Sequence, residues 1–123
     1  SNINRKINEH KNNRRNIMSF TVDTKMIENV AKLTLTGALD SSTAPILQEE
    51  IMKIIPQNPL ELVMDVEKLD FMASAGLRII IFAKQKLGAQ AKLILVKPQD
   101  QLKETLKMTG LIYSVVIVDE YPE

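Results

Sequence analysis

The chain has 123 residues, of which 45% are apolar and 25% charged, a composition that suits one water-soluble domain with a single apolar core. It contains no Cys and one His, so disulfides and thiolate chemistry are excluded, and a metal site would have to rely on carboxylates and His10. No apolar run approaches the roughly 20 residues that a membrane-spanning helix requires. We therefore expect a cytoplasmic protein without membrane insertion.

The first 17 residues differ from the rest of the chain in charge. They hold five basic residues against the single Glu9, a net charge of +4, whereas the remainder carries 11 basic and 14 acidic residues. We interpret residues 1–17 as a basic, disordered extension and residues 18–123 as the folded domain. A basic arm can also bind nucleic acid, but solvated tails are more common. Ser1-Asn2 is typical of the scar that tag cleavage leaves.

Two strands are predicted at the start of the folded domain. Residues 20–24 and 27–36 are strand-like, and polar and apolar side chains alternate along the second strand. One face would carry Val30, Lys32 and Thr34, and the other face Ala31, Leu33 and Leu35. We expect the two strands to form a hairpin.

A helix and a buried strand follow. The hydroxyl groups of residues 41–43 can cap a helix from about residue 44 to residue 55, which Pro56 and Pro59 terminate. The apolar side of this helix would consist of Ile46, Leu47, Ile51, Ile54 and Ile55. Residues 60–66 are almost continuously apolar, as in a strand that is buried on both faces, and this strand would end at Asp65-Val66.

The second half of the chain continues the alternation of helices and strands. We predict a helix over residues 75–87 that Gly88 closes, a strand over 91–97, a third helix from Pro98 to Gly110 and a last strand over 115–118. Leu102, Leu106 and Met108 would line the third helix. The predicted order is β-β-α-β-α-β-α-β, an α/β fold with a mixed sheet and helices packed against it.

Two carboxylates and one serine are candidates for a functional site. Asp40 follows the second strand, Asp65 lies near the end of the central strand, and Ser74 begins the second helix. Because sites gather at the carboxyl ends of parallel strands, we expect these three residues to lie close together. A helix N-terminus favours a phosphate through its free N–H groups and its dipole, but a serine oxygen there can also simply cap the helix.

Several short motifs together carry a family resemblance. They are Gly37-x-Leu39-Asp40-x-x-Thr43-Ala44, Asp65-Val66, Phe71-Met72-Ala73-Ser74-Ala75-Gly76-Leu77, Gly88 and Gly110-Leu111. In this order and spacing, residues 18–118 resemble the STAS domain, named for sulfate transporters and anti-sigma factor antagonists. The resemblance implies a small α/β domain that binds an anti-sigma factor, a serine kinase with an ATP-binding fold, and so frees a sigma factor. It also implies that this partner phosphorylates Ser74 and that a phosphatase reverses the modification.

The chain departs from the family pattern beside this serine. Ala73 stands where many regulated members have an aspartate, and Ala75 stands in place of a second hydroxyl residue. The switch does not need those side chains, because a phosphate itself adds about −1.5 to −2 charges to a partner-facing surface. We predict phosphorylation at Ser74 and partner contacts at Asp40, Asp65, Ala73, Ala75, Gly76, Arg78 and Ile81. For both aspartates a structural role stays open, as a stabiliser of a turn or as a hydrogen-bond acceptor within the fold.

The second helix has a stripe that points away from the predicted sheet. At 3.6 residues per turn this stripe comprises Ser74, Arg78, Ile81 and Gln85, whereas Leu77, Ile80, Ala83 and Leu87 fall on the sheet side. Ile81 would then be an exposed apolar residue beside Arg78, as in a partner-binding surface. If the helix is rotated, Ile81 packs in the core instead.

Enzymatic functions have little support in the sequence. Ala73-Ser74-Ala75-Gly76 lacks the first glycine of a G-x-S-x-G nucleophile motif, His10 lies in the basic extension, and there is no glycine-rich phosphate loop with its lysine. We predict a non-catalytic regulatory module without cofactor, metal or direct nucleic-acid contact, present as a monomer or weak dimer. The alternative is a structural STAS subunit of a membrane transport complex, such as a lipid-transport ABC system, in which Ser74 stays unmodified.

Overall fold

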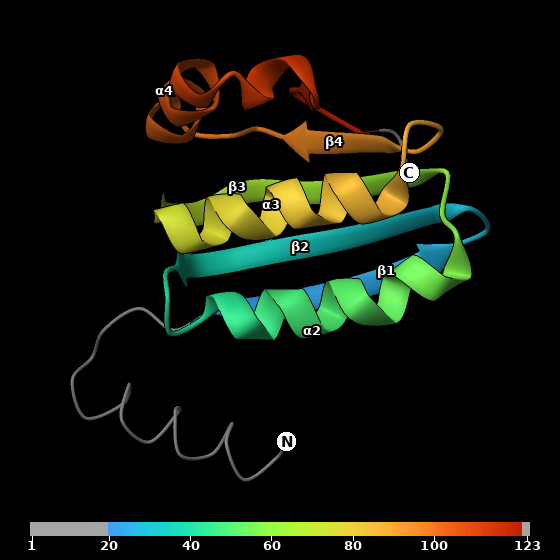
Figure 1. The fold of residues 1–123 in the computed structure, drawn as a ribbon. Helices are drawn as coiled ribbons and strands as arrows, with labels where there is room; N and C mark the ends of the chain where they lie inside the picture. Colours follow the sequence, from blue (N-terminus) through green and yellow to red (C-terminus); the bar gives the residue numbers. More distant parts are fainter. Residues whose placement is uncertain (1–19, 122–123) are drawn as a thin grey trace, which may run out of the picture.

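The computed structural model describes residues 20–121, which form a five-stranded sheet with three α-helices in the predicted order (Figure 1). The strands are β1 (Thr21–Ile27), β2 (Val30–Leu39), β3 (Glu61–Met72), β4 (Lys92–Val96) and β5 (Val116–Val118). The helices are α2 (Ala44–Ile54), α3 (Ser74–Leu87) and α4 (Asp100–Thr109), with short 3₁₀ turns η1 (Ile55–Gln57) and η2 (Leu111–Tyr113). The sheet is mixed, because β1 pairs antiparallel with β2 and the other pairs are parallel.

The first two strands form the predicted hairpin, but its turn lies further along the chain than expected. β1 continues to Ile27, and the turn consists of Glu28 and Asn29 rather than residues 25–26. Glu28 adopts a φ of 54°, the left-handed conformation that two-residue hairpin turns require. The alternation along β2 is confirmed, because Ala31, Leu33 and Leu35 are fully buried and the intervening side chains are half-buried.

All three helices lie on the same face of the sheet. The order of the strands in space is the order in the chain, so every parallel connection steps in one direction. Right-handed crossovers that all step in one direction place their helices on one face. The main apolar core accordingly combines buried residues of all three helices with one face of the strands, and Figure 1 shows α2 and α3 crossing the same side of the sheet.

β3 is longer than the predicted strand over residues 60–66 and carries two irregularities. Its register against β2 gains an extra residue between Thr34 and Thr36, and again near the end of both strands. Such bulges shift the alternation of a strand, and here they return Leu69 and Met72 to the helix-covered core. β3 ends at Met72, and only Ala73 separates it from α3.

The helices bury the predicted stripes with one exception. Leu47, Ile51 and Ile54 of α2 and Leu102 and Leu106 of α4 are buried. The expectation that Met108 also lines α4 is wrong, because this side chain lies near the end of the helix and is 85% exposed. Gly88 and Gly110 terminate α3 and α4 as predicted, each with a positive φ.

The opposite face of the sheet carries no helix among the described residues. Val63, Ile94 and Val96 form a small second cluster there, against which Val118 and Tyr121 pack. The chain after β5 thus covers part of this face. Within residues 20–121 no helix is long and apolar enough to cross a membrane.

Candidate functional site

Ser74 is the first residue of α3, and its side chain is exposed. The N-cap position belongs to Ala73, in extended backbone conformation, and no side chain caps this helix. The Ser74 hydroxyl makes no hydrogen bond with any residue that the structure describes. The interpretation of Ser74 as a helix cap is therefore wrong, and its hydroxyl is available for chemistry from outside.

The start of α3 is held tightly against the ends of β2 and β3. The N–H of Ala73 donates to the carbonyl of Leu39 at 2.8 Å. Gly76 is buried, and a Cβ built on it would lie 2.6 Å from Leu39 Cδ2 and 2.9 Å from Met72 Cγ. The place of Gly76 in the motif thus follows from close packing, and a buried glycine offers a partner no surface.

Asp40 organises the turn between β2 and α2. One of its carboxylate oxygens, Oδ1, accepts from the Ser42 hydroxyl at 2.7 Å, from the Ser42 N–H at 2.9 Å and from the Thr43 N–H at 3.2 Å. The hydrogen bond from the Ser42 hydroxyl is the largest cause of a lowered pKa at Asp40, which burial partly opposes. The Thr43 hydroxyl in turn donates to the carbonyl of Ala38 at 2.8 Å. These contacts give Asp40 the turn-stabilising role that the sequence left open.

Asp40 and Ser74 lie at the same end of the sheet, as expected. Leu39 and Met72 are paired as the last residues of β2 and β3, and the chain continues from them into the turn of Asp40 and into α3. The carboxylate and the free hydroxyl therefore belong to neighbouring segments at the carboxyl edge of parallel strands.

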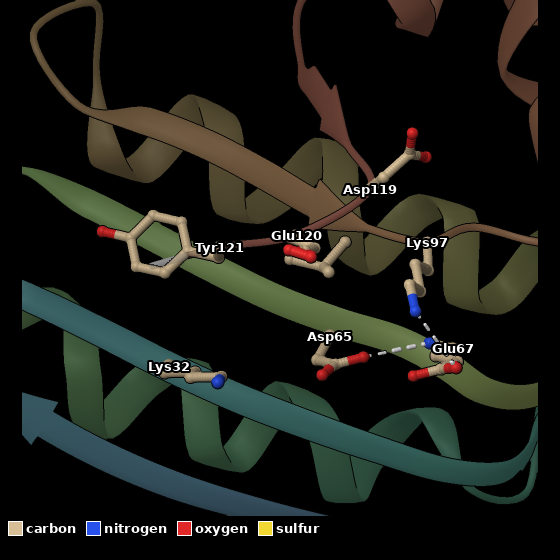
Figure 2. Close-up of a pocket in the computed structure, with 8 residues that line it drawn as sticks. Lys32, Asp65, Glu67, Lys97, Asp119, Glu120 and Tyr121 are labelled. Carbon is tan, nitrogen blue, oxygen red and sulfur yellow. Dashed lines mark hydrogen bonds and ion pairs between the residues drawn. The ribbon is translucent and has the colours of Figure 1, made fainter. Parts of the chain in front are cut away.

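The expected proximity of Asp65 to Ser74 is wrong. Asp65 lies within β3, paired with Thr34 and Val96, and seven further residues of the strand separate it from Ala73. At about 3.3 Å per residue this places it roughly 25 Å from Ala73 and the start of α3, measured along the strand. The side chain lines a hollow on the face without helices, where its Oδ1 accepts the N–H of Glu67 at 3.1 Å (Figure 2).

The hollow around Asp65 holds charges of both signs. Lys97 pairs with Glu67 at 3.5 Å, and the backbone of Lys97 adopts a φ of 54°. Figure 2 shows the chain after β5 entering this region with Asp119, Glu120 and Tyr121. Its acidic residues do not form a group that could hold a metal ion, and none is found elsewhere in residues 20–121. The single histidine, His10, lies outside the described residues.

A groove runs between α2 and α3, next to the start of α3. It is lined by Ser41, Ala44, Pro45, Gln48, Ala75, Arg78, Ile79 and Phe82. Small and apolar side chains form most of its walls, and Arg78 supplies the only charge of this lining. The groove thus combines an apolar floor with a guanidinium at its side, close to the free hydroxyl of Ser74.

The exposed stripe of α3 is arranged as predicted. Ser74, Arg78, Ile81 and Gln85 are exposed, whereas Leu77, Ile80 and Ala83 are buried. Ile81 is 37% exposed and Ile80 is fully buried, so the alternative of a rotated helix with Ile81 in the core is wrong. Ile81 and Arg78 together give the surface beside Ser74 both apolar and cationic character.

Comparison with known proteins agrees with the fold. A model of the STAS domain matches residues 21–121. The chain belongs to the STAS domain family. Over 93 residues it is 31% identical to the anti-sigma-F factor antagonist RsfB of Mycobacterium tuberculosis, an alignment that covers 76% of each protein.

Solved anti-sigma factor antagonists share the architecture. The crystal structure of an anti-sigma factor antagonist from Mycobacterium paratuberculosis has a TM-score of 0.76 and 25% identity, covering 83% of this chain and 87% of that one. The Bacillus cell fate determinant SpoIIAA in its phosphorylated form has a TM-score of 0.66 and 21% identity, covering 83% and 93%. At 21% identity, the similarity to SpoIIAA concerns the fold alone.

Part of the groove in this STAS domain was not predicted from the sequence. The contribution of α2 consists of Ala44, Pro45 and Gln48, together with Ser41 before the helix. These residues recur every three to four positions beside the buried stripe of Leu47, a spacing that marks one side of a helix. What the sequence did not show is that this side of α2 faces α3.

Proposed function

We propose that this STAS domain is a non-catalytic regulatory module that binds an anti-sigma factor of the serine-kinase type and so releases a sigma factor in the cytoplasm. Phosphorylation of Ser74 would switch the binding off, and a phosphatase would restore it. The observation that carries the proposal is the exposed Ser74 hydroxyl, which makes no hydrogen bond to the described residues and lies at the same end of the sheet as the Asp40 turn.

The proposed contact surface comprises part of the residues expected from the sequence. Asp40, Ala73, Ala75, Arg78 and Ile81 belong to the end of the molecule that carries Ser74 or to the exposed side of α3. Asp65 lies on the other face of the sheet and Gly76 is buried, so the proposal leaves both out.

The modification step follows from the chemistry of a free serine. The kinase would transfer the γ-phosphoryl group of ATP to Oγ of Ser74, so that an O–P bond replaces the O–H bond while ADP and a proton leave. Hydrolysis by the phosphatase would return the hydroxyl and inorganic phosphate. SpoIIAA, whose fold this chain shares, exists in a phosphorylated form, which supports the step.

The effect on binding follows from electrostatics. A phosphate brings about −1.5 to −2 charges to a surface that already holds the ionised Asp40. Docking would then require desolvation of the phosphate or its pairing with a new cation. We therefore expect the modified protein to dissociate from its partner.

Affinity capture from the source cell tests this function. The captured proteins and the Ser74 peptide are identified by mass spectrometry, with the Ser74→Ala variant as a control for the phosphopeptide. Recovery of a serine-kinase-like anti-sigma factor together with phosphate on Ser74 is the expected result. Recovery of membrane transporter subunits with unmodified Ser74 would contradict it and would favour a structural subunit of a transport complex.

A further inference from the structure

Ser74 and Arg78 occupy neighbouring positions on the exposed face of α3. They are four residues apart, which on an α-helix places their Cβ atoms about 5–6 Å from each other. Side chains on a helix lean toward its N-terminus, so the long Arg78 side chain extends over the turn that begins with Ser74. The reach of an arginine thus includes the space around the Ser74 hydroxyl.

Arg78 has no acidic partner in the part of the chain that the structure describes. Three lysines elsewhere in the described residues are paired with glutamates, namely Lys53 with Glu50, Lys97 with Glu67 and Lys107 with Glu104. Arg78 is exposed and makes no ion pair or hydrogen bond within residues 20–121. Its guanidinium is therefore available to an anion from elsewhere.

The residues near Ser74 in the sequence and in the fold include acidic side chains, so a phosphate there would be stabilised by a nearby cation. Asp40 lies on the adjoining turn, and Asp70 is exposed four residues before Ser74 in the chain. A phosphate on Ser74 would add to the negative charge at this end of the molecule, and Arg78 is the basic residue one helical turn away. A planar guanidinium can bind two phosphate oxygens at once, which a lysine cannot reproduce.

We propose that Arg78 binds the phosphate of modified Ser74 and is thereby withdrawn from the groove between α2 and α3. The unmodified protein presents this guanidinium to an acidic group of its partner, and phosphorylation occupies it within the same helix. The switch then acts twice, by adding negative charge and by removing the cation that the partner uses. The inference rests on the proposed function in one respect, namely that Ser74 is the modified residue.

The inference is tested with phosphoserine installed at position 74 during protein synthesis, so that no kinase is needed. The second ionisation of a phosphoserine has a pKa of about 6, and ³¹P NMR follows it as the pH is varied. An ion pair with Arg78 favours the dianion and lowers that pKa. In the Arg78→Gln variant we expect the phosphate pKa to be about 0.3–0.7 higher than in the otherwise unchanged protein.

Two further variants separate pairing from general charge. Lys86→Gln removes the same charge from α3 three turns away from Ser74 and should leave the phosphate pKa nearly unchanged. Arg78→Lys keeps the charge without the planar fork and should give an intermediate value. Equal phosphate pKa values in the Arg78→Gln and Lys86→Gln proteins would overturn the proposed pairing.

Binding measurements connect the pairing to regulation. Arg78→Gln should lower the affinity of the unmodified protein for the captured partner. It should also reduce the ratio between the affinities of the unmodified and the phosphorylated protein. An unchanged ratio would overturn the second action of the switch. The NMR experiment tests only the pairing of Arg78 with the phosphate. Absence of phosphate on Ser74 in the cell would instead overturn the proposed function.

Discussion

Gly76 of α3 lies directly against the side chain of Leu39 at the end of β2. A Cβ atom at Gly76 would come within 2.6 Å of Leu39 Cδ2, a distance that real Cβ contacts do not show. Leu39 is fully buried and cannot move aside without disturbing the core. The close approach of α3 to the sheet, and with it the position of Ser74, therefore depends on glycine, which has no side chain, at position 76.

We expect Gly76→Ala to lower the free energy of unfolding by about 1–3 kcal/mol, because the cost of overpacking exceeds the gain in helix propensity. Urea denaturation measures the change. Combining Gly76→Ala with Leu39→Ala should restore part of the loss relative to the sum of the single variants, since the truncated side chain leaves room for the methyl group. Strictly additive losses would show that these two residues do not interact.

Changes at Ser74 should alter partner binding and leave the fold intact. Ser74→Asp should weaken binding to the anti-sigma factor by about tenfold or more through added charge, whereas Ser74→Ala should bind like the unmodified protein. Isothermal titration calorimetry with the captured partner measures both. Because the hydroxyl makes no hydrogen bond to described residues, neither change should shift stability by more than about 0.5 kcal/mol. Equal affinities of the two variants would refute the switch.

Ile81 and its neighbour Ile80 provide a matched pair for testing the exposed face of α3. Ile81→Asp should weaken partner binding while lowering the free energy of unfolding by about 1 kcal/mol or less, because the side chain is partly exposed. Ile80→Asp, at a fully buried position, should cost more than about 3 kcal/mol or prevent folding. Thermal unfolding separates the two. A loss of binding only in proportion to lost stability would argue against Ile81 as a contact residue.

The turn before α2 should give the protein a specific response to acid. The pKa of Asp40 is lowered in the folded state, so its contribution to stability is present above the ordinary value of about 3.9 and is lost as the pH falls through the lowered value. Asp40→Ala should reduce the free energy of unfolding by about 1 kcal/mol at pH 7. This difference should shrink below about pH 4, as urea denaturation at several pH values would show. Asp70→Ala, which removes an exposed carboxylate without hydrogen bonds to described residues, serves as the control.

The chain contains two tyrosines, which allows a direct titration of the contact between Tyr121 and β3. The Tyr121 hydroxyl donates to the Glu61 carboxylate, and this bond, with burial as a smaller cause, raises the pKa of Tyr121. In a Tyr113→Phe background, the ultraviolet absorbance of tyrosinate should therefore rise at a higher pH than in the same protein with Glu61→Gln. The stability that this bond contributes is present below the ordinary value of about 10 and is lost as the pH rises through the raised value. Identical titration curves would show that Tyr121 does not form this hydrogen bond with Glu61 of β3.

Local sequence patterns predicted the elements in which each side meets the same environment along its whole length. The alternation along β2 and the stripe on α3 reflect a buried side and an exposed side that repeat with the period of the strand or the helix. The positions of Ser74 at the start of α3 and of Asp40 in the turn after β2 also follow from local sequence, whereas the sequence left open whether Ser74 caps the helix and whether Asp40 stabilises its turn. These features could be predicted because each of them is decided within one element.

The features that were missed depend on partners elsewhere in the chain. β4 stops opposite Asp65, so the rest of β3 pairs with β2 alone and accommodates charged residues such as Glu67 and Asp70 that are typical of loops. The real length of β3 moved Asp65 away from Ser74. The hairpin turn was misplaced because Glu28-Asn29 is a weak turn signal compared with Asn-Gly or Asp-Gly. In each case the outcome was set by pairing rather than by local preference.

The match between strand order in space and strand order in the chain has a consequence for how the protein acquires its structure. Each strand finds its neighbour among residues already synthesised, so the sheet can grow outward from the β1–β2 hairpin as the ribosome adds each helix and strand. No strand has to insert between two that have already paired. The segment carrying Ser74 follows β3, so its docking place against the end of β2 exists before α3 is complete.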